Sequence, residues 1–213
     1  GLLDIFRNET QDWFWSKYKA QINIGVTGWW GDLGEPEKHP AAIRHNLKEL
    51  GFKRLFKADE VHNIYGHYWN KMLFEKYAKE YPSVRLFNLN RSGYAGSARY
   101  GIFPWSGDVS RSWEGLQAQL PLMLGMSLSG VPYIHADAGG FAGGDIDPEL
   151  YTRWLQFASF TPVFRPHGTA FGDLEPGVKN IPSEAVFYDD PYKSIVRKLM
   201  QMRYQLLPYN YTL

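Results

Sequence analysis

Two aspartates, Asp32 and Asp108, stand directly after short strand-like segments in surroundings rich in glycine and tryptophan. The first lies within Gly28–Pro36, which reads Gly-Trp-Trp-Gly-Asp-Leu-Gly-Glu-Pro, and the second ends Phe103–Asp108, which reads Phe-Pro-Trp-Ser-Gly-Asp. Glycoside hydrolysis needs two carboxyl groups, because one attacks the anomeric carbon or orders a water and the other protonates the leaving oxygen. The two aspartates are therefore candidates for that pair. The alternative is that each only caps a turn or helix, although Ser112 is the better cap after Asp108.

Further polar groups stand where they could bind sugar hydroxyls. In His135–Phe141 the glycines allow a close backbone approach, and Asp137 can accept hydrogen bonds from hydroxyls. The acidic stretch Asp137–Glu149 lacks the spacing of an EF-hand calcium loop, so we expect no metal site there. A lone histidine is more often structural, but His167 adjoins Arg165 at a strand end, which favours hydroxyl binding.

The composition excludes several classes of partner. The 213 residues carry 23 basic and 22 acidic side chains, a net charge of +1, which gives no reason to expect nucleic acid or an anionic membrane surface. No stretch reaches about 18 consecutive apolar residues, so no transmembrane helix is expected. There is no cysteine and no nucleotide-binding glycine motif, and we expect no cofactor. Aromatic residues make up 16% of the chain, which suits a filled core and also a sugar-binding cleft.

The elements that must position these residues alternate between strand-like and helical patterns. The strand candidates are Ile22–Trp30, Val84–Leu89, Gly101–Trp105, Val131–His135 and Pro162–Phe164, with Leu2–Phe6 as the tail of a sixth. The helix candidates are Asn8–Tyr18 with Asn8 as its cap, Tyr65–Tyr81, Ser112–Leu128, one opened by Asp147-Pro148, and one opened by Asp190-Pro191 with Ile195, Leu199, Met202 and Leu206 on its buried stripe.

Such an alternation predicts a parallel sheet covered by helices. A polar residue follows nearly every strand candidate: Asp32, Arg91, Asp108, Asp137 and His167. In a (β/α)8 TIM barrel the carboxyl ends of the strands meet at one mouth, whereas a doubly wound sheet gathers its site at one switch point. Because the barrel needs eight strands, we expect residues 1–213 to be one partial catalytic barrel domain. It would supply about strands 4–8 with their helices, and the remainder of the barrel would lie upstream.

Five motifs in this order resemble glycoside hydrolase family 31, the family of α-glucosidases and α-xylosidases. They are the W-x-D-x-x-E-P segment at Trp30, the arginine segment Asn90–Gly96, W-x-G-D at Trp105, D-x-G-G-F at Asp137 and F-R-x-H at Phe164. The resemblance covers nearly the whole chain. It implies that Asp32 is the nucleophile and Asp108 the general acid/base. It also implies a pocket for the non-reducing-end sugar, lined by Trp30, Arg91, Trp105, Asp137, Phe141, Arg165 and His167.

The implied function is that of a retaining α-glucosidase. It would cleave non-reducing-end α-glucosyl units from an α-linked oligosaccharide through a covalent glycosyl-enzyme intermediate, with its two carboxyls roughly 5–5.5 Å apart. The family's nucleophile motif commonly has Met and Asn where this chain has Leu33 and Gly34. This form resembles a bacterial branch that includes oligosaccharide 4-α-glucosyltransferases, which would imply a periplasmic or secreted protein. An α-xylosidase, a non-catalytic carbohydrate-binding fragment and a purely structural α/β piece remain the alternatives.

Overall fold

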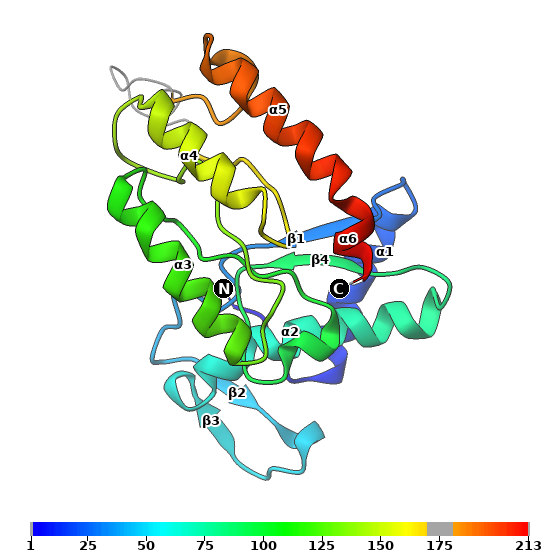
Figure 1. Ribbon diagram of the computed structural model, residues 1–213. Helices are drawn as coiled ribbons and strands as arrows, with labels where there is room; N and C mark the ends of the chain where they lie inside the picture. The colour runs from blue at the N-terminus through cyan, green and yellow to red at the C-terminus, as the bar shows by residue number, and fades with distance from the viewer. Residues whose placement is uncertain (1, 170–180, 213) are drawn as a thin grey trace. The chain divides into compact units, whose positions relative to one another are not determined.

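The structure of the protein is a computed structural model that describes residues 2–169 and 181–212 (Figure 1). The chain divides into two compact units, Gly1–Pro104, called unit 1, and Trp105–Leu213, called unit 2.

Unit 1 is built on two helices and a short parallel pair of strands. The helices are α1, Asn8–Ile22, and α2, Ala58–Glu80, and the strands are β1, Gly28–Gly31, and β4, Phe87–Asn90. The strands pair in parallel over their full length, so that Gly31 lies opposite Asn90 and the carboxyl ends coincide. The next residue after each strand therefore emerges at the same edge.

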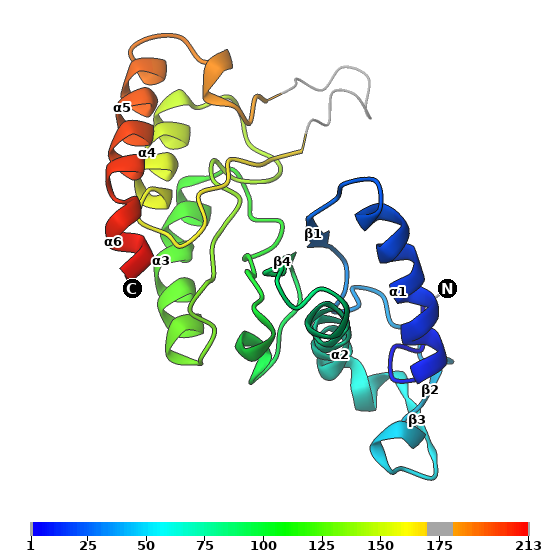
Figure 2. The same cartoon turned by 90° about the vertical axis from the view of Figure 1, so that its right-hand side faces the viewer.

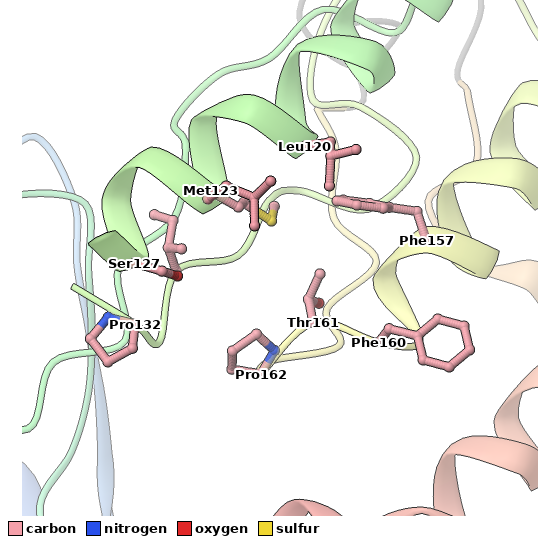
Figure 3. A pocket seen from close by; sticks show the side chains of 10 residues that line it. Leu120, Met123, Ser127, Pro132, Phe157, Phe160, Thr161 and Pro162 are labelled. Carbon is pink, nitrogen blue, oxygen red and sulfur yellow. The ribbon is translucent and has the colours of Figure 1, made fainter. Parts of the chain in front are cut away.

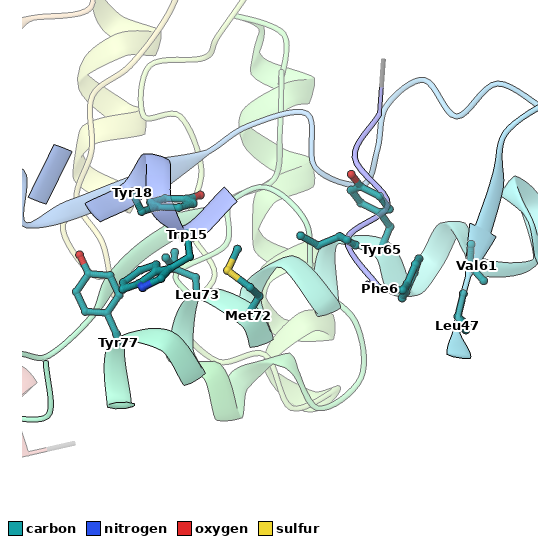
Figure 4. Packing of buried hydrophobic residues seen from close by; sticks show 10 residues of the cluster. Phe6, Trp15, Tyr18, Leu47, Val61, Tyr65, Met72, Leu73 and Tyr77 are labelled. Atoms are coloured by element: carbon teal, nitrogen blue, oxygen red, sulfur yellow. The ribbon is translucent and has the colours of Figure 1, made fainter. Parts of the chain in front are cut away.

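The core of unit 1 lies along α1 and α2. Figure 4 shows Trp15 and Tyr18 of α1 beside Met72, Leu73 and Tyr77 of α2. These side chains are buried, and apolar burial is worth roughly 25 cal/mol per Å². This core holds α2, the helix that lies next to the end of β1.

A small antiparallel hairpin precedes α2. It pairs β2, Arg44–Asn46, with β3, Leu55–Lys57, around the 3-10 turn η1, Lys48–Leu50. The sequence patterns did not predict it, since three-residue strands are too short to show an alternation. A second 3-10 turn, η2, spans Ser97–Tyr100.

Unit 2 consists of helices joined by extended segments. Its helices are α3, Trp113–Leu128; α4, Pro148–Ala158; α5, Tyr192–Gln205; and α6, Leu207–Thr212, with the 3-10 turn η4 at Ala185–Phe187. In Figure 2, as in Figure 1, α4 and α5 lie side by side. Fully buried Trp154 and Leu155 of α4 lie at the centre of a core that also takes Val196 of α5.

Unit 2 also has an apolar hollow of about 270 Å³ beside α3 and α4 (Figure 3). Its lining consists of Leu120, Met123, Leu124, Ser127, Pro132, Ile134, Phe157, Phe160, Thr161 and Pro162. None of these is a sequence-predicted site residue.

The helix predictions are confirmed at α3 and α4, where the caps form as expected. Ser112 Oγ accepts from Gly115 N at 3.0 Å, and Asp147 Oδ1 accepts from Leu150 N at 2.9 Å. The cap prediction for α1 is wrong, because Asn8 is the first helical residue and makes no side-chain capping bond.

Two other helix predictions need correction. Helix α2 begins at Ala58, well before the predicted Tyr65, because Glu60 folds back to accept a hydrogen bond from Lys57 N at 2.7 Å. In α5 the predicted buried stripe is only half-buried, and Val196 is the buried residue instead.

The strand predictions are only partly right. β1 and β4 overlap the predicted strands Ile22–Trp30 and Val84–Leu89, but each ends one residue later than predicted, and Ile22 belongs to α1. Beyond this pair and the hairpin, the described residues show single parallel bridges, among them Ile102 with Asn88, Trp105 with His135 and Pro166 with Ala138. The predicted strands Gly101–Trp105, Val131–His135 and Pro162–Phe164 do not form ladders, and they contain Pro104, Pro132 and Pro162 respectively. Proline has no N–H to donate and so interrupts a ladder of hydrogen bonds. Leu2–Phe6 forms no strand; Ile5 and Phe6 pack into the core instead.

Candidate active site

Asp32 follows the last residue of β1 directly. Its Oδ1 accepts a hydrogen bond from Leu33 N at 2.9 Å and lies 3.4 Å from Nε of Arg91. The side chain is 40% exposed. Since the carboxylate makes an ion pair as well as a local turn bond, capping alone does not account for Asp32.

Arg91 stands at the same edge, directly after β4. Its backbone N donates to Gly31 O at 3.0 Å, which ties it to the end of β1. Its guanidinium is bidentate with Glu35, with Nε to Oε1 at 2.7 Å and Nη2 to Oε2 at 3.2 Å, and Nη2 also donates to Glu37 at 2.8 Å. The pKa of Arg91 is raised, first by the hydrogen bond to Glu35 and then by Glu37 and the charge of Asp32.

Arg91 was predicted as a pocket residue, but no role was predicted for Glu35 and Glu37, which bind it more closely than Asp32 does. The available signal was the spacing, since Glu35 lies three residues after Asp32 in the same motif. A hollow of about 290 Å³ lies beside this group and is lined by Glu35, His62, Asn63, Gly66, Arg91, Ser92, Gly93 and Tyr94. Trp30, in β1, is 55% exposed.

In unit 2, Arg165 contacts the side chains of Asp137, His135 and Trp105. Its Nη2 forms an ion pair with Asp137, which is 1% exposed, and its Nε donates to His135 Nε2 at 3.2 Å. The guanidinium carbon lies 5.2 Å from the centre of the Trp105 ring, within the range of a cation–π contact. A buried carboxylate needs such a partner, because an uncompensated charge in the interior is costly.

His135 was quoted in a motif but not predicted as a site residue. It is fully buried, and because Nε2 accepts from Arg165 this nitrogen carries no proton. The imidazole is therefore an acceptor that helps to orient the guanidinium.

The glycine-rich turn positions Phe141 and His167. Phe141 N donates to Val109 O at 2.8 Å, and its ring stacks on His167 with centres 5.7 Å apart and planes at 27°. Gly140 has a φ of 83°, and a Cβ there would lie 2.7 Å from Cα of Arg111. Only glycine fits, so the close backbone approach expected from the sequence is present.

Asp108 lies in the segment before α3 and has an exposed side chain. The cap of α3 is Ser112, whose hydroxyl accepts from the helix. Val109 N donates to Gly107 O at 2.9 Å, and Val109 O accepts from Phe141 N. The turn that carries Asp108 is thus tied to the turn that carries Phe141.

Each predicted residue therefore has a defined place. Within unit 1 the structure brings together Asp32 and Arg91 after adjacent strands. Within unit 2 it brings together Trp105, Asp137 and Arg165. No group of three or more His, Cys, Asp or Glu side chains among residues 2–169 and 181–212 is arranged to hold a metal ion. Over the same ranges no helix is both long and apolar enough to cross a membrane.

Comparison with known proteins defines the class of domain. The model of the TIM-barrel domain of glycosyl hydrolases family 31 matches residues 1–213, the whole chain. The chain belongs to this family, and its fold is that of a (β/α)8 barrel.

The similar proteins include both an alpha-xylosidase and an alpha-glucosidase. An alpha-xylosidase of Saccharolobus solfataricus is 32% identical over 212 residues, which is 98% of this chain and 28% of that protein. Alpha-glucosidase 2 of Bacillus thermoamyloliquefaciens is 32% identical over 218 residues, 99% of this chain and 26% of that protein. The chain thus spans little more than a quarter of the length of these relatives.

Solved structures of the family agree in fold. A GH31 dextranase of Flavobacterium johnsoniae complexed with glucose aligns with a TM-score of 0.84 at 33% identity, covering 100% of this chain and 26% of that one. A GH31 alpha-xylosidase from a soil metagenome complexed with xylose aligns at 0.81 and 29% identity, covering 97% and 32%.

Proposed function

We propose that these residues form part of the catalytic barrel of a retaining α-glycosidase of the α-glucosidase type. Asp32 is the nucleophile and Asp108 the general acid/base. The observation that supports this most directly is the placement of Asp32 at the carboxyl end of β1, paired with Arg91 from the end of the adjacent strand. The carboxyl ends of barrel strands are where the catalytic residues of this fold lie.

The proposed reaction has two steps. Asp32 attacks the anomeric carbon while Asp108 gives its proton to the glycosidic oxygen, so that the leaving sugar departs and a glycosyl ester forms on Asp32. Asp108 then takes a proton from water, whose oxygen displaces Asp32 from the anomeric carbon. The guanidinium of Arg91, whose Nε lies 3.4 Å from Asp32 Oδ1, is the cation beside the proposed nucleophile.

The remaining predicted residues form the proposed sugar pocket. Trp30, Trp105 and Phe141 offer aromatic faces to the C–H patches of the ring. The ion pair of Asp137 and Arg165 offers hydrogen-bonding groups for hydroxyls, and His167 stacks on Phe141. The substrate is an α-linked oligosaccharide, and its non-reducing-end sugar occupies this pocket.

We further propose that residues 1–213 are one partial barrel domain that supplies about strands 4–8, with the earlier strands upstream. The support is the parallel β1–β4 pair, the single parallel bridges that follow, and the greater length of the relatives. The full-length protein is therefore the one to assay.

Two other activities share this scaffold. Transfer of the glucosyl unit to a sugar replaces water by a sugar hydroxyl in the second step, and an α-xylosidase accepts a sugar that lacks the hydroxymethyl group. The alpha-xylosidase relatives favour keeping the latter as the second candidate. Product analysis with α-glucosides and α-xylosides, each with and without added maltose as acceptor, separates the three.

The test of the proposed roles uses Asp32→Asn and Asp108→Ala in the full-length protein. We expect Asp32→Asn to abolish turnover of every α-glucoside. Asp108→Ala should reduce hydrolysis of oligosaccharides by about 10²–10⁴-fold, with a smaller loss for an activated glucosyl fluoride, whose leaving group needs no proton. Sugar binding without turnover, unchanged by either substitution, would instead identify a non-catalytic carbohydrate-binding module.

A further inference from the structure

The loop that carries Asp32 rests on the indole of Trp69. Two buried glycines flank the loop, and both face this ring. A Cβ on Gly34 would lie 2.3 Å from Cζ3 of Trp69, and a Cβ on Gly31 would lie 3.2 Å from its Cη2 and 2.3 Å from Nδ2 of Asn90. The indole therefore fills the space that side chains at positions 31 and 34 would need.

The indole is itself fixed from the opposite side. Its Nε1 donates to the hydroxyl of Tyr18 at 2.9 Å, and its ring centre lies 5.9 Å from that of Phe14. Tyr18 is buried against Trp29, with ring centres 4.5 Å apart, and burial raises its pKa to about 12, so the hydroxyl stays protonated. Trp69 is thus a rigid support held by the core of α1 and α2.

The backbone between the two glycines needs such a support. Leu33 has a φ of 56°, in the left-handed region that is unfavourable for a side chain with a Cβ. Its own side chain is 53% exposed, so packing of Leu33 does not hold this conformation. The conformation is held by the bond from Arg91 N to Gly31 O, the bond from Leu33 N to Asp32 Oδ1, and the contact of the indole with Gly34.

We propose that Trp69 is a positioning residue for Asp32. Acting through Gly31 and Gly34, it fixes the backbone on both sides of the nucleophile and so sets the direction in which the carboxylate meets the anomeric carbon. This inference rests on the proposed role of Asp32. A displacement of about 1 Å at a reacting group costs about 10²-fold in rate, so a change at Trp69 affects the chemical step before it affects binding.

The test compares Trp69→Leu with Trp13→Leu in the full-length protein. Trp13 is a matched control, since it is 52% exposed on α1 and is not among the side chains that face Gly31 and Gly34. Active sites are titrated with a fluorosugar, so that kcat is measured for each folded site. We expect Trp69→Leu to lower kcat per site by about 10²-fold with little change in KM, and Trp13→Leu to leave both unchanged.

A second pair of variants tests the space that the indole fills. Gly34→Ala should lower kcat per site because the new Cβ meets the ring, and Gly34→Ala combined with Trp69→Leu should recover at least part of the loss. Unchanged kcat per site in Trp69→Leu, with only fewer titratable sites, would show a merely structural tryptophan and overturn the inference. The inference would also be overturned if the fold-losses in kcat per site of the two single variants simply multiplied in the double variant. If Asp32→Asn keeps its turnover, the proposed function has failed instead, which distinguishes the two.

Discussion

At the scale of single residues, the guanidinium of Arg91 connects Asp32, the proposed nucleophile, to the rest of the loop. It contacts three carboxylates at once, with Glu35 and Glu37 closer than Asp32. The planar fork of arginine allows the bidentate bond to Glu35 while Nε still faces Asp32. For the position of its ion-pair partner, Asp32 therefore depends on Glu35 and Glu37, which bind the guanidinium of Arg91.

Arg91→Lys tests this dependence. A lysine keeps the charge but loses the bidentate geometry, so kcat/KM should fall by about 10²-fold although the loop still contains a cation. Steady-state kinetics of the full-length protein on an aryl α-glucoside measures the effect. Arg85→Lys, at an exposed arginine of the same unit, is the control and should behave as wild type. Equal kcat/KM in the two variants would contradict the role given to Arg91.

A second group of residues predicts how stability depends on pH. His39 Nε2 lies 2.7 Å from His45 Nε2, His39 Nδ1 lies 3.2 Å from His62 Nδ1, and His45 Nδ1 lies 2.9 Å from Asp4 Oδ1. The pKa of His39 is lowered, first by burial and then by the neighbouring charges of His45 and His62. The folded state therefore binds fewer protons than the unfolded state in the range where histidine titrates.

Stability should consequently be highest above the ordinary pKa of histidine, about 6.5, and should decline as the pH falls below it. Urea unfolding of wild type and His39→Gln at pH 7.5 and pH 5.5 measures the free energy of unfolding. The wild type should lose more stability on acidification than the variant. A variant with the same or a steeper decline would show that His39 does not carry this dependence.

At the scale of elements, the core of unit 2 depends on α4. Leu155 is fully buried in that helix, whereas Leu128, the last residue of α3, is 90% exposed. Leu155→Ala should reduce the free energy of unfolding by about 2–5 kcal/mol, and Leu128→Ala should change it by at most about 0.5 kcal/mol. Urea denaturation of both variants checks this. A small effect of Leu155→Ala would mean that α4 is not the centre of this core.

The helices also show how much of the fold could be predicted from the sequence. Ser112 and Asp147 were predicted as caps because a hydroxyl or carboxylate before an apolar periodic run is a local signal. The start of α2 was missed because its capping acceptor, Glu60, lies inside the helix and bonds back to Lys57. Arg54 also holds Glu60, and the two bonds lower the pKa of Glu60 to about 2. The spacing of apolar residues along the chain gives no information about such a contact between polar groups.

The site was predictable to a similar extent. Motif order placed Asp32 and Arg91 after neighbouring strands, and the structure pairs them. The sequence did not assign Trp69 to the loop, because its contact with Gly34 joins positions far apart in the chain and depends on how α2 packs. Nothing in the sequence indicates that a glycine of the motif and a tryptophan of the helix are in contact; only the structure shows it.

At the scale of the whole molecule, the chain is family 31 TIM-barrel sequence from its first residue to its last. Its relatives are three to four times as long, since they are matched over 28% and 26% of their length. The proposed division of labour gives the nucleophile to unit 1 and the acid/base to unit 2, with the earlier barrel strands upstream. The proposed function therefore belongs to the full-length protein, and it requires one covalent bond, between the anomeric carbon of the sugar and Asp32.

Incubation of the full-length protein with an activated fluorosugar of the α-gluco configuration, followed by proteolysis and mass spectrometry, looks for that bond directly. A fluorine on the sugar slows both steps, and the activated leaving group speeds only the first, so the glycosyl ester accumulates. The account predicts a single modified peptide with the ester on Asp32, and no labelling of Asp32→Asn. An ester on any other residue, or turnover with inversion at the anomeric carbon and no ester at all, would contradict it.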